Sequence, residues 1–128
     1  MSYDVKSHIL GFDDTKKVEI VEIDELFATM KDAENEAISF TLVNPYPLRE
    51  YSFDVPLATQ ALLDLKEDSN VRVYNIVVIQ KPLEESRINF LAPIIINEDN
   101  KTLAQVVLDP KSYPEFGIAE PIKEFIKE

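Results

Sequence analysis

The sequence predicts an all-β fold, mainly antiparallel, in which a small sheet rolls into a β-barrel-like shape with one or two short helices. Three observations lead to this prediction. Short runs rich in β-branched residues recur along the chain, residues that favour tight turns separate these runs, and only two segments show helical periodicity. With 128 residues, of which 45% are hydrophobic, the chain is expected to form a single domain over residues 1–128 around one core.

Four strands are expected in the first 80 residues. Val71 to Gln80 gives the clearest pattern, because valine and isoleucine alternate there with polar or aromatic side chains. Lys17 to Ile23 and Ile38 to Asn44 have the same character. Leu26 to Lys31 fits either a strand or a short helix, and we interpret it as a strand.

A bent hairpin is expected further along the chain. Glu85 to Leu91 and Pro93 to Asn97 lie on either side of Ala92, and proline cannot donate a hydrogen bond to a central ladder. The chain should therefore bend at Ala92 and Pro93, so that one apolar run becomes two short strands. Glu98-Asp99-Asn100-Lys101 then supplies a tight turn, and Thr102 to Leu108 returns as a strand. The residues expected on its apolar face are Ala104, Val106 and Leu108.

Two short segments have helical character, and a proline opens each of them. Pro121 to Glu128 is too short to be stable alone and must dock on another part of the structure. Asn44 to Pro56 contains three prolines and three aromatic residues, which predicts an ordered loop across the open end of the sheet. The other helical segment is Pro56 to Leu65, whose expected apolar face consists of Leu57, Ala61, Leu62 and Leu65.

The charge of the chain excludes some classes of function. The 24 acidic and 13 basic side chains give a net charge of −11, so direct binding of nucleic acid is not expected. Such a charge suits solubility or attraction to a basic protein partner. The sequence contains neither an apolar run of about 18 residues nor a recognisable secretory signal, so we expect a cytoplasmic protein that does not enter a membrane.

Residues that perform chemistry are few. The chain has no cysteine and only one histidine, His8, so thiol chemistry and multi-histidine metal sites are not available, and no catalytic role is expected for His8. Acidic pairs such as Asp13-Asp14 and Glu84-Glu85 are interpreted as solvated turns and strand ends. Neither a glycine-rich phosphate loop nor a calcium loop occurs. We therefore predict that the protein is not an enzyme and binds no cofactor and no metal.

Several short motifs follow one another in order over nearly the whole chain. In the second half they are Glu84-Glu85-Ser86, Asn89, Phe90, Ala92-Pro93, Ile94 to Asn97, Gln105 to Leu108 and Tyr113-Pro114. In the first half they are Gly11 to Asp14, Phe40 to Pro45 and Tyr51 to Pro56. In their order and spacing, these motifs resemble the flagellar assembly factor FliW family.

The resemblance implies a β-barrel-like, non-enzymatic protein of the cytoplasm with two protein partners. One partner would be flagellin, bound in a chaperone-like manner before its export. The other would be CsrA, an RNA-binding translational regulator that represses flagellin mRNA. Once flagellin is exported, the freed protein would bind and antagonise CsrA, which would couple flagellin synthesis to export. We also expect the free protein to be a monomer.

The bent hairpin is expected to serve as a scaffold and as an edge that presents contacts to a partner, because a strand edge can bind an extended segment through backbone hydrogen bonds. We interpret the amides of Asn89 and Asn97, which bracket the bend, as partners of backbone groups left unpaired by Pro93. An aromatic residue in a proline-containing segment either packs on the core or anchors a partner. The residues expected to contact partners are Asn89, Asn97, Glu98, Gln105 and Tyr113.

Two other classes of protein stay open at the level of the sequence. A small barrel that carries a ligand or acts as an enzyme would need a deep pocket with converging polar groups and a perturbed titratable residue. A generic acidic adaptor unrelated to motility would need only a binding surface.

Overall fold

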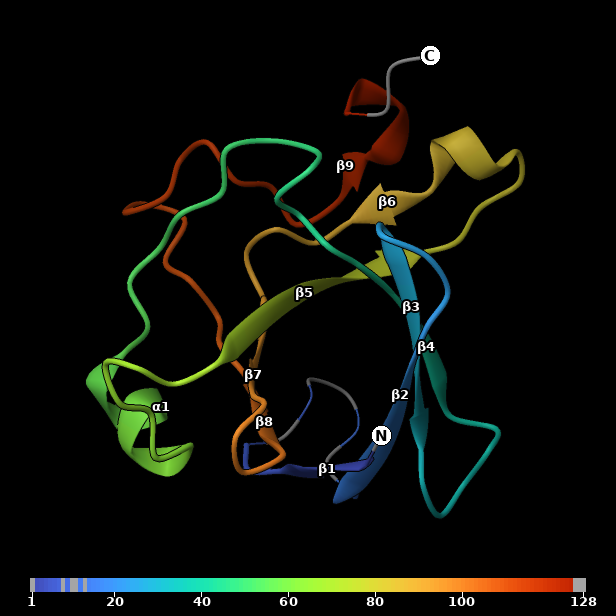
Figure 1. Cartoon of the computed structure of the whole chain (residues 1–128). Helices are drawn as coiled ribbons and strands as arrows, with labels where there is room; N and C mark the ends of the chain where they lie inside the picture. Colours follow the sequence, from blue (N-terminus) through green and yellow to red (C-terminus); the bar gives the residue numbers. More distant parts are fainter. Residues whose placement is uncertain (1, 8, 10–11, 13, 126–128) are drawn as a thin grey trace.

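The structure, a computed structural model that describes residues 2–7, 9, 12 and 14–125, consists mainly of short strands (Figure 1). The strands are β1 (Ser2–Val5), β2 (Lys17–Glu22), β3 (Phe27–Asp32), β4 (Ser39–Val43), β5 (Val71–Val78), β6 (Arg87–Ile88), β7 (Ile94–Asn97), β8 (Thr102–Gln105) and β9 (Glu120–Pro121). The helical elements are α1 (Leu57–Leu62) and two 3₁₀ turns, η1 (Leu83–Glu85) and η2 (Ile122–Glu124). The expectations for His8, for part of the Gly11 to Asp14 turn and for the last three residues lie outside the described residues.

Seven of the strands close into a barrel. They follow the order β4-β3-β2-β1-β8-β7-β5, and β5 pairs with β4 to complete the ring. These pairings are antiparallel except that of β1 with β8, which is parallel. β6 and β9 extend the sheet beside the end of β5. The predicted fold class, a mainly antiparallel small β-barrel, is confirmed, and the segment that also fitted a helix forms β3.

The predicted bend lies where the chain passes from β6 to β7. One edge of β5 pairs with β4, and the other edge pairs with β7 along its first half and with β6 at its end. The segment between β6 and β7 forms no strand, and Ala92 and Pro93 lie in it. The N–H of Val106 donates to the Pro93 carbonyl at 2.9 Å, but Pro93 has no N–H to donate in return. This one-sided pairing explains why β8 ends at Gln105, earlier than predicted.

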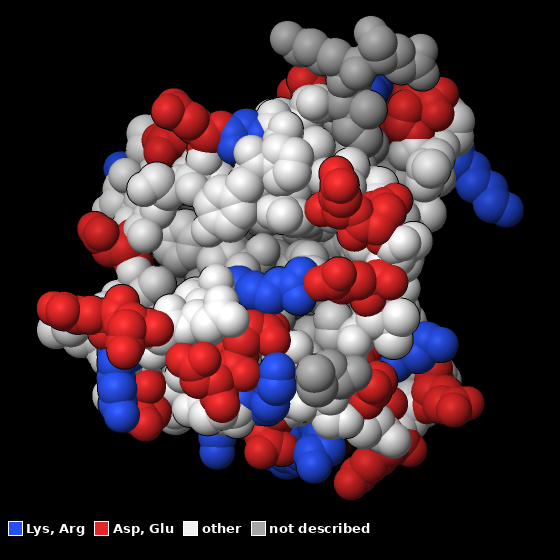
Figure 2. All heavy atoms as spheres, viewed as in Figure 1, with Lys and Arg blue, Asp and Glu red and all other residues white. Residues whose placement is uncertain are grey.

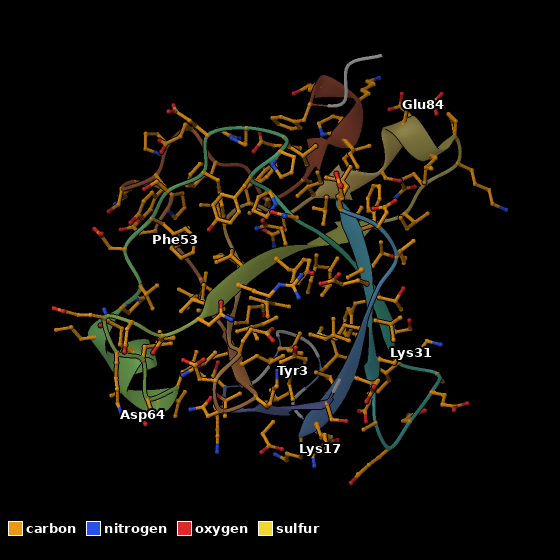
Figure 3. All side chains as sticks on the ribbon, in the orientation of Figure 1. Tyr3, Lys17, Lys31, Phe53, Asp64 and Glu84 are labelled. Carbon is orange, nitrogen blue, oxygen red and sulfur yellow. The ribbon has the colours of Figure 1, made fainter. Side chains whose placement is uncertain are left out.

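Alternating strand residues fill the barrel with apolar side chains. β7 contributes Ile94 and Ile96, β8 contributes Leu103, and β5 contributes Tyr74, all of them buried. Tyr3 of β1, labelled in Figure 3, belongs to the same cluster. Because successive strand residues point to opposite faces, one residue in two reaches this inner cluster. The interior is therefore packed with side chains, as is usual in small barrels.

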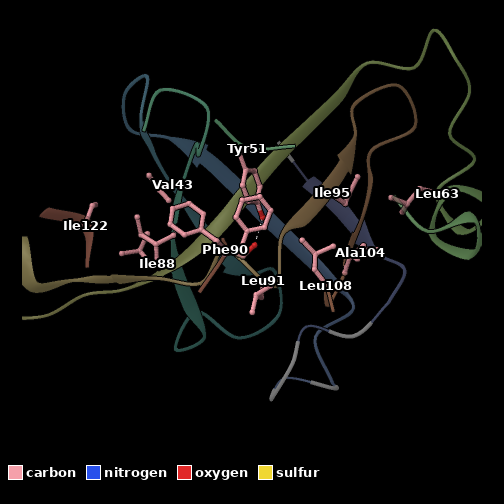
Figure 4. Packing of buried hydrophobic residues seen from close by; sticks show 13 residues of the cluster. Val43, Tyr51, Leu63, Ile88, Phe90, Leu91, Ile95, Ala104, Leu108 and Ile122 are labelled. Atoms are coloured by element: carbon pink, nitrogen blue, oxygen red, sulfur yellow. Dashed lines mark hydrogen bonds between the residues drawn. The ribbon is translucent and has the colours of Figure 1, made fainter. Parts of the chain in front are cut away.

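A second hydrophobic core lies on the outer face of β5, β7 and β8, and we call it the outer core. The alternate strand residues, such as Ile95 and Ala104, build its floor (Figure 4). The proline-containing loop of residues 44–56 covers it with Tyr51, and the segment before β9 covers it with Phe116. The loop is ordered as predicted, but it packs on this outer core rather than across the barrel opening. β7 reads as a continuous apolar run because both of its faces are buried.

The helix α1 is shorter than predicted and buries a different residue. Leu63, directly after the helix, is fully buried in the outer core, whereas Leu57 is 81% exposed and Leu62 is 45% exposed. Asp64 follows with φ 54°, and the N–H groups of Asp64 and Leu65 donate back into the last turn, to Ala61 and Gln60. This left-handed stop, a Schellman motif, ends the helix early. Of the expected apolar face, Leu57, Ala61 and Leu62 are therefore exposed, and only Leu65, which follows the helix, packs against the outer core.

The two ends of the chain also differ from the prediction. β1 was not predicted, because four residues are too few to show an alternation, and it depends on pairing with β2 and β8. The helix predicted from Pro121 is replaced, in its described part, by the end of β9 and the single turn η2. The N–H of Ile122 donates to the Ser86 carbonyl at 2.8 Å, so pairing with the β6 region outweighs the local helical tendency.

Candidate functional site

A hollow of about 590 Å³ lies at one end of the barrel, where β4 begins and β5 ends, and we call it the barrel mouth. Its wall includes Phe40 and Ile76, which also pack against the inner cluster. The walls of barrel mouths are frequent binding sites, because they are concave and mostly apolar. The exposed apolar residues around it are Phe12, Val78, Ile79 and Ile118.

Two of the five expected partner contacts, Asn89 and Gln105, line the barrel mouth. The Oδ1 atom of Asn89 accepts a hydrogen bond from the Leu91 N–H at 3.0 Å. The Nε2 atom of Gln105 donates to the Ala92 carbonyl at 3.2 Å. Both amides thus support the backbone around the bend, a role that the sequence had assigned to Asn89 and Asn97. Contact of either side chain with a partner stays a prediction.

Asn97 and Glu98 lie at the opposite end of the barrel, at the turn between β7 and β8. Asn97 is 2% exposed, and its Nδ2 atom donates to the Leu63 carbonyl at 2.9 Å. Its amide therefore holds the end of α1 against the hairpin and does not serve the bend at Pro93. The Glu98 carboxylate accepts hydrogen bonds from the Tyr3 hydroxyl at 2.8 Å and from the Lys101 ammonium at 3.1 Å. The neighbouring Asp99 is the exposed acid of this turn.

Polar side chains close this second end of the barrel. Burial, followed by the hydrogen bond to Glu98, raises the pKa of the Tyr3 phenol well above its usual range. Burial alone would lower the pKa of Arg72, but its hydrogen bond to Glu22 raises it. Arg72 also donates to the Tyr74 hydroxyl inside the barrel. Two ion pairs, Arg72–Glu22 and Lys101–Glu98, therefore lie at this end, in contrast to the mostly apolar barrel mouth.

Tyr113, the last of the expected contacts, packs on the outer core. Its ring stacks on Phe116 with the ring centroids 5.7 Å apart, and its hydroxyl accepts a hydrogen bond from the Asp54 N–H at 2.9 Å. It is partly buried. Its contact with a partner stays a prediction. The five expected residues do not form one site: two lie at the barrel mouth, two at the closed end and one over the outer core.

A buried polar network joins the loop of residues 44–56 to β5. The Tyr51 hydroxyl donates to the Phe90 carbonyl, and the dashed line in Figure 4 marks this bond. The Nδ2 atom of Asn75 donates to the Tyr51 oxygen at 3.1 Å and to the Asn89 carbonyl at 2.9 Å. Asn75 was the one polar interruption in the predicted central strand, and this network explains its presence there.

Arg49 is a further residue that the sequence did not single out. Its guanidinium carbon lies 5.0 Å from the ring centroid of Phe90, 4.9 Å from that of Phe116 and 5.5 Å from that of Phe125. It also pairs with Glu120 at 3.2 Å. Arg49 thus fastens the loop to the C-terminal part of the chain through cation–π and ionic contacts. Its partners are distant in sequence, so no local pattern could have identified it.

Among the described residues, no group of three or more acidic or histidine side chains is placed to hold a metal ion. No helix in the same part of the chain is long and apolar enough to cross a membrane. What the structure offers instead is a packed barrel, polar side chains engaged in structural hydrogen bonds, and a mostly apolar hollow at the barrel mouth. These features define a class, the small β-barrel proteins whose surfaces are suited to binding.

Comparison with known proteins identifies the family within this class. The FliW protein family matches residues 2–122. The chain is 54% identical to flagellar assembly factor FliW 1 of Wolinella succinogenes over the full length of both, and 46% identical to flagellar assembly factor FliW of Campylobacter lari over 100% of this chain and 98% of that one. A crystal structure of the flagellar assembly factor FliW superposes with a TM-score of 0.86 at 21% identity, over 99% of this chain and 87% of that one. The chain belongs to the FliW family, as its motifs had indicated.

Proposed function

We propose that this chain is a cytoplasmic flagellar assembly factor that acts by binding proteins and not by catalysis. The observation that carries the proposal is membership of the FliW family over residues 2–122, together with relatives that bear the name flagellar assembly factor, one of them at 54% identity. The packed interior agrees with it, since a ligand carrier of the lumen type would need free space inside the barrel.

The proposed partners are flagellin before export and a CsrA-type RNA-binding translational regulator. Flagellin occupies the protein while it accumulates in the cell. After export of flagellin, the freed monomeric protein binds the regulator and relieves the repression of flagellin mRNA. The exchange of partners makes the supply of flagellin follow its export.

The net charge of −11 suggests how the regulator is kept from RNA. Negative charge held within about a Debye length, roughly 8 Å, of an RNA-binding groove repels phosphate groups. The protein itself therefore binds no nucleic acid in this proposal. If the effect on RNA release were independent of salt after correction for complex formation, electrostatic repulsion would be the wrong explanation.

The barrel mouth is the proposed contact surface for one of these partners. Ile79 and Ile118 are 49% and 69% exposed, and both line the hollow. Exposed apolar side chains around a concave surface are typical of protein interaction sites. Asn89 and Gln105, on the wall of the same hollow, would then contribute polar contacts to the complex.

The test is a calorimetric titration of the purified protein with flagellin and, separately, with the CsrA-type regulator of the same organism. Competition follows, with the regulator titrated into the preformed flagellin complex. The variant Ile79→Gln/Ile118→Gln probes the barrel mouth, and Val21→Gln removes an apolar side chain that is equally exposed but lies on the outer face of β2. We expect both partners to bind, flagellin to block the regulator, and only the mouth variant to weaken a complex. Absence of binding of both partners to the folded protein would refute the proposed function.

A further inference from the structure

The helix α1 presents apolar side chains to solvent. It contains no buried residue, and Leu57 and Leu62 are 81% and 45% exposed, with Ala61 exposed between them. The sequence encodes these residues as an amphipathic face, but Leu63 occupies the place in the core that this face would fill. Single exposed leucines are common on protein surfaces, whereas a helix that turns its apolar residues outward suggests an interaction site.

Acidic side chains surround this apolar face. Asp64, Glu67 and Asp68 follow the helix directly, and Lys66 is the only basic residue between positions 54 and 71. Figure 2 shows acidic side chains at the lower left of the molecule, where Figure 1 places α1, and Figure 3 labels Asp64 there. We call the apolar residues Leu57, Ala61 and Leu62, together with the acidic residues Asp64, Glu67 and Asp68, the α1 corner.

Two neighbouring features extend the α1 corner. A hollow of about 480 Å³ beside the helix is lined by Asp54, Leu65, Lys66, Glu67 and Val71, among others, so it combines apolar walls with two carboxylates and one ammonium group. Asp99, at the tip of the β7–β8 hairpin, accepts a hydrogen bond from the N–H of Asn70 at 3.1 Å, which brings another carboxylate to this side of the molecule. The whole region thus offers apolar contact area inside a negatively charged rim.

We propose that the α1 corner docks a segment of a partner protein in which leucine-, isoleucine- or valine-type side chains stand beside lysine or arginine. The apolar side chains of the segment cover Leu57 and Leu62, and its cations meet the carboxylates of the rim, so that the two surfaces are complementary in charge. A second copy of this chain does not fit, because it would bring one acidic rim against another. The inference extends the proposed function, since the segment belongs to one of the two proposed partners.

Two variants separate the apolar part of the α1 corner from the charged part. Leu57→Gln/Leu62→Gln removes the exposed leucines and keeps a good helix former at both positions. Asp64→Asn/Glu67→Gln/Asp68→Asn removes three charges, and asparagine tolerates the positive φ at position 64. Matched controls elsewhere on the surface are Val21→Gln/Ile23→Gln for the leucines and Asp14→Asn/Glu34→Gln/Glu36→Gln for the charges, all at exposed positions.

The measurement is the dissociation constant of each variant with flagellin and with the CsrA-type regulator, at two salt concentrations, after circular dichroism has shown that every variant is folded. We expect both corner variants to weaken binding of the same partner by about tenfold or more. The charge variant should also lose part of the salt dependence of that complex, because it removes three carboxylates of the rim and keeps Asp54 and Asp99. The control variants should stay within about twofold of the wild type.

The outcomes distinguish the docking proposal from the proposed function. If both partners bind the corner variants as tightly as the wild type, the α1 corner is not a docking surface, and the proposed function is unaffected. If neither partner binds the wild type, the proposed function fails, and labelled ten-residue peptides of leucine and lysine or of leucine and glutamate test the corner alone. Preference of the wild type for the lysine peptide, lost in both corner variants, supports the docking proposal, and equal or no binding overturns it.

Discussion

The buried hydroxyl of Tyr51 gives the sharpest test of how the outer core is held to the barrel. Replacement of Tyr51 by phenylalanine keeps the ring, which lies 5.6 Å from that of Phe90, and removes only the oxygen. The Phe90 carbonyl then loses the hydrogen bond that Tyr51 donates, and the Asn75 amide loses one of its two acceptors. Phe90 and Asn75 are both fully buried, so water cannot easily replace the lost bonds.

The expected cost follows from the groups left without partners. A buried polar group deprived of its hydrogen bond costs about 1–3 kcal/mol, and the Asn75 amide keeps its bond to the Asn89 carbonyl, so we expect a total loss of about 2–3 kcal/mol. With an unfolding entropy of about 2.1 cal/mol/K per residue, 128 residues correspond to a decrease in melting temperature of roughly 7–11 °C.

The assay is urea unfolding followed by circular dichroism, with a parallel thermal scan. Tyr113→Phe is the matched control, because it removes a phenolic oxygen that only accepts a bond from the exposed Asp54 N–H, and its cost should be below about 1 kcal/mol. A loss below about 1 kcal/mol for Tyr51→Phe, or an equal loss for both variants, would show that the buried network does not stabilise the outer core.

Four further variants, which make three comparisons, test other parts of the structure by urea unfolding. Leu63→Ala should cost about 2–5 kcal/mol because it leaves a cavity in the outer core, whereas Leu62→Ala should cost less than about 1 kcal/mol. Arg49→Met should cost about 1–2 kcal/mol through loss of the cation–π contacts and the partly exposed ion pair, and stability should become less dependent on salt. Hydrogen bonds from the Glu34 N–H and the Thr15 hydroxyl lower the pKa of the Asp32 carboxyl group. The contribution of this carboxylate to the free energy of unfolding is thus present above its pKa in the unfolded state and is lost as the pH falls through its pKa in the folded state. The wild type should therefore lose stability more steeply than Asp32→Asn below about pH 4.

These predictions fail in different ways. Similar costs for the alanine variants of the two leucines would mean that the observed register of α1 is wrong. An unchanged salt dependence in Arg49→Met would mean that its ion pair with Glu120 contributes nothing. If stability fell equally steeply with pH in the wild type and in Asp32→Asn, the Asp32 carboxylate would not contribute to the pH dependence of stability.

Most of the strands and the bend, but not β1 and β9, were predictable from the sequence because they depend on neighbouring residues. The alternation in residues 71–80 produces β5, and the missing N–H of Pro93 interrupts the ladder wherever that segment is placed. The turn between β7 and β8 likewise needs residues that tolerate a tight turn, and Lys101 adopts a positive φ of 56° there. Of the motifs that indicated the FliW family, Ala92-Pro93 lies at this bend and Ile94 to Asn97 forms β7.

The residues that the sequence placed wrongly, or missed, are those whose roles depend on distant segments. The helical period shows that Leu57, Ala61 and Leu62 share a face, but only the packed outer core decides that Leu63 enters it instead. The partners of Arg49 come together only when the C-terminal segment folds over the loop.

The sequence by itself determined the fold class, the bend, the family and the acidic charge of this protein. The tertiary structure decided that the barrel has an apolar end and a polar end, that Glu98 turns toward Tyr3, and that α1 presents its leucines to solvent. The physical reason is that periodicity is a property of consecutive residues, whereas burial depends on how segments that are distant in sequence pack together in the core.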